Sequence, residues 1–251
     1  MPVLAFDTST DRMSIALGHT LDGADRVWSF EGPGAAQSSH TLVPAIMDLM
    51  AQARLTLAEL DAIAFARGPG AFTGLRSACA VAQGLAFGAR ARTGGVPVPV
   101  LPLDSLLVLA EQARLQHAPE ITRWQVLALL DARMDQIYAG SYRWEHGAWQ
   151  TVTGPVLASP QDLRAEACEA LVGNVFANYG DRLPGADQLP RFTALPEARA
   201  MLRLAPGLLA RGHAVDPALA LPVYVRDKVA STTAERAATH AAALSAPASR
   251  P

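Results

Sequence analysis

The residues of this sequence with the clearest potential for chemistry lie in a glycine-rich stretch, RGPGAFTGLRS, at positions 67–77. A glycine-rich turn that leads into a helix commonly binds phosphate, because backbone N–H groups and the helix N-terminus point at the anion. The glycines are spaced G-x-G-x-x-x-G, which matches neither the dinucleotide-binding pattern nor the P-loop, whose lysine is also missing. Arg67, Thr73 and Arg76 are the side chains that could hold an anion here.

The same stretch has an explanation that needs no ligand. From Gly74 to Gly88 the expected helix consists largely of Gly, Ser and Ala, and small residues let a neighbouring element approach closely. We therefore favour a tight strand-to-helix turn, with Thr73 as the cap of a close-packing helix. Anion binding stays open as the alternative.

A second candidate is the turn DTST, which follows a short apolar segment expected to be a strand. In actin-like and sugar-kinase-like ATPases, a turn after the first strand faces phosphate and metal. A plain hairpin turn, in which Asp7 bonds to nearby amides, explains the same residues equally well. The weak candidate set for residual phosphate contacts is therefore Asp7, Thr8, Thr10, Thr73 and Arg76.

Other patterns for catalysis or metal binding are scarce. The six histidines show no metal-ligand spacing, the two cysteines lie far apart, and no G-x-S-x-G motif occurs. Lys228 is the only lysine. The turn DARMDQ, residues 131–136, carries two acids and an arginine, which we interpret as solvated turn charges rather than a functional site. We predict no catalytic residue, no metal and no cofactor.

Composition limits the class of protein. The chain has 251 residues, of which half are apolar and 18% are charged, so it can form one large domain or two small ones. The net charge of -2 argues against a protein that binds nucleic acid alone, because such binding needs a basic surface. No signal-peptide pattern or membrane-length apolar stretch is present. These features predict a soluble, cytoplasmic protein with no membrane partner.

The first half of the sequence predicts an α/β arrangement with a mixed sheet. Three strand-like segments are followed by alternating helices and strands, in the order β-β-β-α-β-α-β-α. The helix expected over residues 40–54, with Ser38 and Ser39 as caps, carries two adjacent apolar stripes, so it needs partners on two sides. The segments are VLAFDTS, MSIALGH, DRVWSFEG, helix 40–54, LDAIAFARGPG, helix 74–88, VPVPVLPL and DSLLVLAEQARL.

The second half predicts a smaller unit with a weaker pattern. Two strands are expected around the DARMDQ turn, and the alanine-rich residues 230–251 are expected to be disordered. No period of 20–50 residues repeats. The other expected elements are a capped helix in SPQDLRAEACEAL, a strand and turn in ALVGNVFANYG, a helix in EARAMLRLAPGLLARG and an extended segment, ALPVYVRD.

Several of these segments together resemble the bacterial TsaB (YeaZ) family. The motifs are LAFDTST, SSHTLVPAIMDLM, DAIAFARGPGAFTGLRSACAVAQGLAFG and PVLPLDSLLVLA, with weaker support from ALLDARMDQIYAGSY and LPVYVRD. The resemblance implies an actin/Hsp70-like (ASKHA) two-lobe fold, with mixed β-sheets flanked by helices. The lobes are expected at 1–104 and 105–229.

The resemblance also implies a function in making N6-threonylcarbamoyladenosine (t6A) at adenosine 37 of tRNA. The family's catalytic paralogue, TsaD, has an H-x-x-x-H metal pair, and this sequence has Ser105 and Leu109 where those histidines are expected. The implied role is a non-catalytic scaffold that activates TsaD. The expected partners are a TsaD-like paralogue, a TsaE-like ATPase and a second copy of the chain, with tRNA reached only through the complex.

In this family the helix with SSHTLVPAIMDLM and the helix after the glycine loop form the dimer surface. This implied dimer surface agrees with the two adjacent apolar stripes of the first helix and with the small residues of the second. The expected interface residues are Leu42, Ile46, Leu49, Met50, Leu75, Cys79 and Gln83.

Two other functions compete with the scaffold. The first is an enzyme of the same fold, either an ATPase or a metallopeptidase-like (glycoprotease-like) protein. The sequence shows neither the second phosphate loop that an ATPase needs nor the set of metal ligands that a metallopeptidase needs. The second is an autonomous tRNA binder, which conflicts with the net charge.

Overall fold

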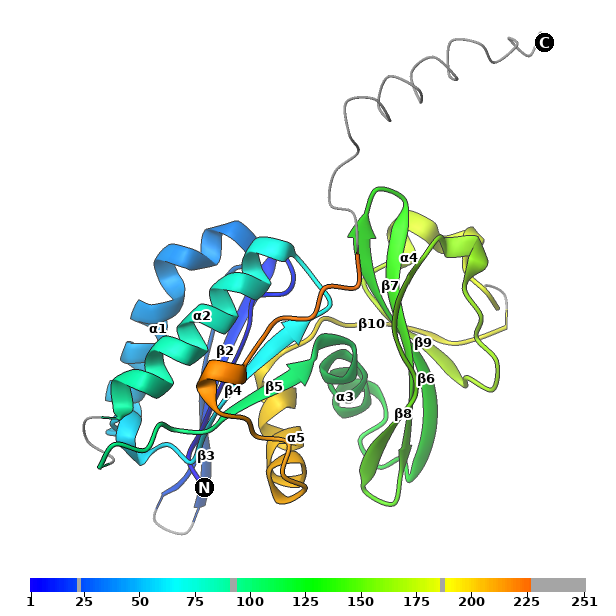
Figure 1. The fold of residues 1–251 in the computed structure, drawn as a ribbon. Helices are drawn as coiled ribbons and strands as arrows, with labels where there is room; N and C mark the ends of the chain where they lie inside the picture. Colours follow the sequence, from blue (N-terminus) through cyan, green and yellow to red (C-terminus); the bar gives the residue numbers. More distant parts are fainter. Residues whose placement is uncertain (22–23, 91–93, 186–187, 227–251) are drawn as a thin grey trace, which may run out of the picture.

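The computed structural model describes residues 1–21, 24–90, 94–185 and 188–226, so the tail expected at 230–251 lies outside the described residues. The described chain forms two five-stranded sheets with helices between and around them (Figure 1). This confirms the expected α/β class with mixed sheets flanked by helices.

The first sheet has the strand order β3-β2-β1-β4-β5. Its first three strands are antiparallel, whereas β4 and β5 extend it in parallel. The expected three strands followed by alternating helices and strands are therefore confirmed. The strands are β1 (Val3–Asp7), β2 (Arg12–Leu21), β3 (Ala24–Pro33), β4 (Ala62–Gly68) and β5 (Val100–Asp104).

The second sheet repeats this topology. Its order is β8-β7-β6-β9-β10, with an antiparallel hairpin pair followed by two parallel additions. The DARMDQ turn joins two strands as expected, but β8 and β10 were not anticipated. The strands are β6 (Arg123–Arg133), β7 (Gln136–Glu145), β8 (Ala148–Ala158), β9 (Ala170–Gly173) and β10 (Arg191–Thr193).

Helices cover both faces of the first sheet. One face packs against α1 (Ser38–Ala53) and α2 (Phe72–Ala89), whose apolar stripes complete a core with Phe6, Ile15 and Phe65. The other face packs against α5 (Ala198–Ala210) and part of α3 (Ser105–His117). Among the described helices, none is both long and apolar enough to cross a bilayer.

The helix α3 lies between the two sheets (Figure 1). Its Val108 belongs to the core of the first sheet, whereas Leu106 and Leu109 pack against the second. The opposite face of the second sheet is covered by the chain between β8 and β10, including the short α4 (Phe176–Tyr179).

One expectation for the second half was wrong. The segment SPQDLRAEACEAL has only a short 3-10 turn, Pro160–Asp162, and then covers the sheet with buried Leu163 and Cys168. The range 105–229 is not confined to the second lobe, because α5 packs on β1 and β2 and residues 217–223 lie along α2. These segments pack against the first sheet. Residue 104 therefore separates the strands of the two sheets but not all of the helices and loops, and the lobe boundary stays a prediction.

Candidate functional site between the lobes

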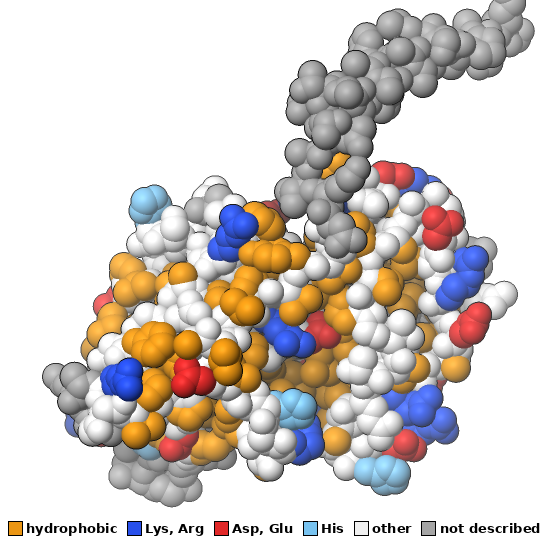
Figure 2. Space-filling view, viewed as in Figure 1, with side chains coloured by type: hydrophobic (Ala, Val, Ile, Leu, Met, Phe, Trp, Pro, Cys, Tyr) orange, Lys and Arg blue, Asp and Glu red, His pale blue; other side chains and the backbone are white. Residues whose placement is uncertain are grey.

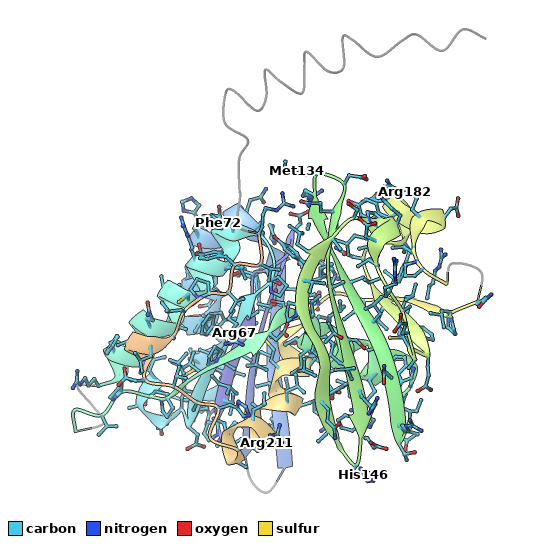
Figure 3. All side chains as sticks on the ribbon, turned by 45° about the vertical axis from the view of Figure 1, so that its right-hand side comes forward. Arg67, Phe72, Met134, His146, Arg182 and Arg211 are labelled. Carbon is cyan, nitrogen blue, oxygen red and sulfur yellow. The ribbon has the colours of Figure 1, made fainter. Side chains whose placement is uncertain are left out.

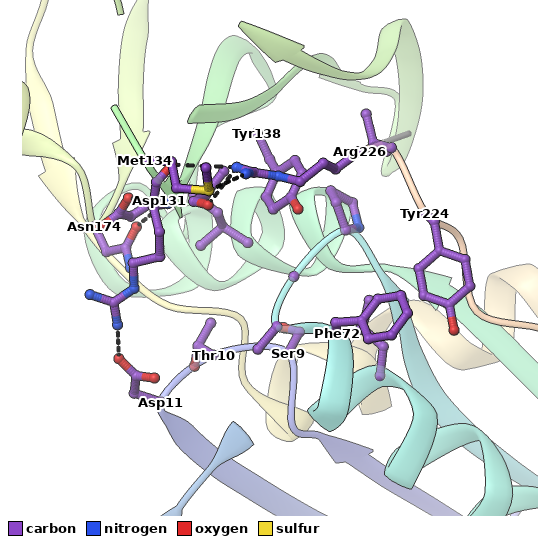
Figure 4. A pocket seen from close by; sticks show the side chains of 18 of the residues that line it. Ser9, Thr10, Asp11, Phe72, Asp131, Met134, Tyr138, Asn174, Tyr224 and Arg226 are labelled. Carbon is purple, nitrogen blue, oxygen red and sulfur yellow. Dashed lines mark hydrogen bonds and ion pairs between the residues drawn. The ribbon is translucent and has the colours of Figure 1, made fainter. Parts of the chain in front are cut away.

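A cavity of about 450 Å³ lies where the turns after β1 and β6 face each other (Figure 4). The turns meet there because each follows the first strand of its own sheet, and the two sheets share one topology. The lining residues are Ser9, Thr10, Asp11, Pro69, Gly70, Ala71, Phe72 and Leu75 from the first lobe, Leu130, Asp131, Ala132, Arg133, Met134, Tyr138, Asn174 and Asn178 from the second, and Val223, Tyr224, Val225 and Arg226 near the end of the described chain.

The turn after β1 is held by its own hydrogen bonds. The buried carboxylate of Asp7 accepts hydrogen bonds from the backbone N–H of Ser9 at 2.8 Å and from its hydroxyl at 2.9 and 3.0 Å. Burial nevertheless raises the pKa of Asp7 to about 7, because the ionised form is desolvated. Thr8 is buried, so of the three predicted residues here only Thr10 lines the cavity. Their phosphate contacts stay a prediction.

Gly70, in the loop before α2, and Gly74, in the first turn of α2, let the backbone of the turn after β1 approach closely. A Cβ on Gly70 would lie 2.5 Å from the carbonyl oxygen of Ser9, and one on Gly74 would lie 1.9 Å from that of Thr8. The Thr8 hydroxyl also donates a hydrogen bond to the Gly74 carbonyl at 2.7 Å. The glycines are therefore explained by backbone contact between loop, helix and turn, as the packing interpretation of the sequence favoured.

Thr73 and Arg76 lie outside the cavity lining. Thr73 is exposed and does not cap α2, because the helix begins at Phe72 with Ala71 at its N-cap. The cap prediction was therefore wrong. Arg76 is directed along the helix surface, where its guanidinium lies 3.8 Å from the centroid of the Phe72 ring and its Nε donates to the hydroxyl of Tyr224 at 3.0 Å.

The turn between β6 and β7 has an unusual backbone. Arg133, Met134 and Asp135 have φ values of 61°, 54° and 59°, a left-handed conformation that costs about 1–2 kcal/mol per non-glycine residue. Ionic contacts at both ends hold it, because Arg133 pairs with Asp11 of the first lobe and Arg182 pairs with Asp135. Figure 3 shows Met134 and Arg182 at this end of the second lobe.

Asp131 begins this turn and is bonded within the second lobe. Its carboxylate accepts hydrogen bonds from the Tyr179 hydroxyl at 2.9 Å and from the backbone N–H of Arg133 at 2.8 Å. The Asn178 amide also donates to it, at 3.3 Å. The sequence predicted solvated charges in DARMDQ, and the side chains of Arg133 and Asp135 are indeed 69% and 61% exposed, although each also forms an ion pair.

Residues 217–226, hereafter the strap, cross from the first lobe to the second and form part of the cavity wall. The backbone N–H of Val223 donates to the Arg67 carbonyl at 2.7 Å. At the far end the guanidinium of Arg226 donates to the carbonyl of Ala132 at 2.8 Å. The sequence predicted only an extended segment here, since nothing local indicates which surface it follows.

Most of the predicted interface residues are buried in the monomer. Their stripes face the first sheet and, for Cys79 and Gln83, the strap, and their contact with a partner stays a prediction. Gln83 is half-buried, and the buried ones are Leu42, Ile46, Leu49, Met50, Leu75 and Cys79. The large apolar side chains that these two helices do expose are Val43, Met47 and Phe87, at 40%, 47% and 40%.

Two sheets of identical topology, a helix between them and a cavity bounded by their first hairpin turns define an α/β protein of the actin/Hsp70-like (ASKHA) two-lobe class. A family model for TsaD, tRNA N6-adenosine threonylcarbamoyltransferase, matches residues 32–244. Relatives named tRNA threonylcarbamoyladenosine biosynthesis protein TsaB are 33% identical in Haemophilus influenzae, over 91% of this chain and 95% of the relative, and 31% identical in Escherichia coli, over 92% and 96%. The chain belongs to the TsaB (YeaZ) family.

A solved structure supports the same assignment. YeaZ from Pseudomonas aeruginosa superposes with a TM-score of 0.75 at 35% identity, over 89% of this chain and 99% of that one. The shared fold therefore extends through both lobes, including the weakly patterned second half.

The cavity is a poor match for the nucleotide phosphates that its fold class implies. Among the described residues, its charged side chains are two acids and two arginines, Asp11, Asp131, Arg133 and Arg226. Each arginine is already engaged by a carboxylate or by backbone carbonyls. A polyphosphate carries several negative charges, and the two acids of the described lining offset its two arginines, so this lining offers no net positive charge to it.

Proposed function

We propose that this chain is a non-catalytic subunit of a tRNA threonylcarbamoyltransferase complex, in which it binds and activates a TsaD-like catalytic paralogue. Its membership of a family named for tRNA threonylcarbamoyladenosine biosynthesis supports the pathway. The proposed role is t6A synthesis at adenosine 37, with a TsaE-like ATPase as a further partner and tRNA bound through the complex.

The observation that carries the docking proposal is the outer face of α1 and α2. Val43 and Met47 are one helical turn apart on α1 and both are exposed, and Phe87 is exposed on α2. Figure 2 shows hydrophobic side chains gathered over these helices. Exposed apolar side chains on two helices in contact with each other are candidates for an interaction site, so we propose that the TsaD-like partner docks here and contacts Val43, Met47 and Phe87. A second copy of the chain could use the same face.

The N-terminal turn of α3 supports the non-catalytic part of the proposal. Ser105 and Leu109, which occupy the expected histidine positions, are both fully buried. The preceding Asp104 is committed to the fold, since it caps Leu106 N–H at 2.9 Å and accepts a hydrogen bond from the Tyr142 hydroxyl at 2.6 Å. Within the described ranges, no three His, Cys, Asp or Glu side chains gather as a metal site.

The test is a binding measurement with the purified TsaD-like paralogue. We expect the wild-type chain to form a heterodimer in gel filtration and calorimetry. Met47→Asp should weaken it at least 10-fold, because a charge replaces an exposed apolar contact. The matched control is Val152→Asp, which places a charge at a 46%-exposed valine on β8 of the other lobe.

Three results separate the alternatives. Loss of binding in Met47→Asp alone supports the proposed face, whereas equal binding by both variants and wild type overturns it. Absence of any complex with the wild-type chain overturns the subunit proposal itself. If the wild-type chain instead dimerises with itself and Met47→Asp is monomeric, the face is an interface between copies.

A further inference from the structure

The strap follows one face of α2. Phe72, Arg76, Cys79 and Gln83 are spaced by four, three and four residues, which places them on a single helical stripe. All four contact the strap. The Phe72 and Tyr224 rings lie 4.7 Å apart between centroids, and Arg76 donates to the Tyr224 hydroxyl.

The two C-terminal residues of the stripe, Cys79 and Gln83, donate hydrogen bonds to backbone carbonyls of the strap. The Cys79 thiol donates to the Ala220 carbonyl at 3.1 Å, and the Gln83 amide donates to the same oxygen at 3.1 Å and to the Pro217 carbonyl at 3.0 Å. The path of the strap is thus set by α2 up to Tyr224.

Two residues further on, the strap holds the turn of the other lobe. The Arg226 guanidinium donates to the carbonyls of Ala132 and Arg133 at 2.8 and 3.3 Å, and its Nη1 lies 3.0 Å from the sulfur of Met134. Only Val225 separates Tyr224 from Arg226, and it packs on the core of the second lobe. Tyr224, on the α2 side, and Arg226, on the second-lobe side, are therefore joined through a single residue.

The turn that Arg226 contacts is strained and depends on outside support. Three successive left-handed residues, Arg133, Met134 and Asp135, are not glycines. Such a backbone persists only where the surroundings hold it in place. Arg226 is one of these supports, and it comes from the strap rather than from the lobe that carries the turn.

We propose that the strap is a conformational link between the outer face of α2 and the cavity between the lobes. When Phe72 and Arg76 hold Tyr224, Arg226 keeps the turn 133–135 in its left-handed form, and the cavity wall is as seen in Figure 4. When Tyr224 is released, Arg226 withdraws and the turn relaxes, which changes the wall. Tyr224 is 43% exposed, so a molecule bound beside α2 can reach it.

The test uses the free protein and its six methionine methyl groups, labelled with ¹³C and observed by NMR. Met134 reports the turn, and its signal is assigned with Met134→Leu. The change in the Met134 chemical shift caused by Arg226→Ala serves as the reference for a turn that has lost its contact with Arg226. We expect Arg76→Ala, on the other lobe, to move the Met134 signal in the same direction by at least half as much, and Tyr224→Phe to move it less.

The matched control is Thr73→Ala, an exposed change on the same turn of α2, which should leave the Met134 signal in place. An Arg76→Ala spectrum with Met134 unmoved overturns the link, and so does a Thr73→Ala shift of equal size. The five other methionine methyl signals show whether each variant is folded. This test needs no partner, so its failure is distinct from failure of the proposed function.

Discussion

The two hairpin turns that face each other across the cavity occupy the same place in two sheets of identical topology, yet they differ in environment. In the turn after β1 the first residues, Asp7, Thr8 and Ser9, are buried, and Asp7 is bonded to Ser9 within the turn. The turn after β6 is exposed at Met134, has a left-handed backbone, and is held by side chains from three other segments. Equal topology therefore fixes the position of a turn, while local packing decides its chemistry.

The largest effect is expected where α2 approaches the turn after β1 most closely, at Gly74. Gly74→Ala should lower the free energy of unfolding by about 3 kcal/mol or more, because its Cβ meets the Thr8 carbonyl oxygen at 1.9 Å. Gly84→Ala, also in α2 but with no atom within 4 Å of the added carbon, should raise it by about 0.5–1 kcal/mol. Urea unfolding measures both. Similar effects from the two variants would contradict the close-approach account.

Burial of Asp7 makes the free energy of unfolding depend on pH. Its pKa is about 7 in the folded chain against the ordinary aspartate value of 3.8, so the folded state binds the proton more tightly. Its contribution to stability is fully present below about pH 4 and falls as the pH rises to about 7, by up to about 4 kcal/mol. Asp7→Asn removes this dependence, so the free energy of unfolding of the variant should increase relative to that of wild type between pH 5 and pH 8. A stability difference that is constant across this range would show that Asp7 is not the cause.

The strain of the second turn gives the smallest effect. Met134→Gly should raise the free energy of unfolding by about 0.5 kcal/mol, because glycine adopts a φ of 54° freely but costs entropy in the unfolded chain. The control is Val152→Gly in β8, another exposed residue, which should destabilise by about 1 kcal/mol. Chemical unfolding midpoints of the two variants test the sign, and a destabilised Met134→Gly protein would argue against a strained turn.

Sequence periodicity was sufficient for the first sheet, because its strands are short apolar runs and its helices carry clear stripes. It did not reveal β8, whose run is interrupted by Gly154 and Pro155, or the non-helical cover around Leu163 and Cys168. An amphipathic segment that packs irregularly on a sheet has the same local composition as a helix.

The sequence predicted the separate motifs of the candidate site but not that they line one cavity. The glycine loop and the DTST and DARMDQ turns were noted separately, and the shared cavity follows only from the repeated topology. The buried interface residues show a related limit: the apolar stripe of α1 indicates burial but not which partner buries it. Gln83 and Cys79 meet a strap more than 130 residues away, a contact that no local pattern encodes.

The central claim is that this chain supports threonylcarbamoyl transfer without performing it. The direct measurement is t6A formation on tRNA supplied with threonylcarbamoyl-adenylate, by the chain alone, by the chain with the TsaD-like paralogue and the TsaE-like ATPase, and by the same mixture containing Met47→Asp. The account predicts t6A only in the complete wild-type mixture, with strong loss in Met47→Asp and none with the chain alone. Formation of t6A by the chain alone, or full activity of the mixture without it, would contradict the account.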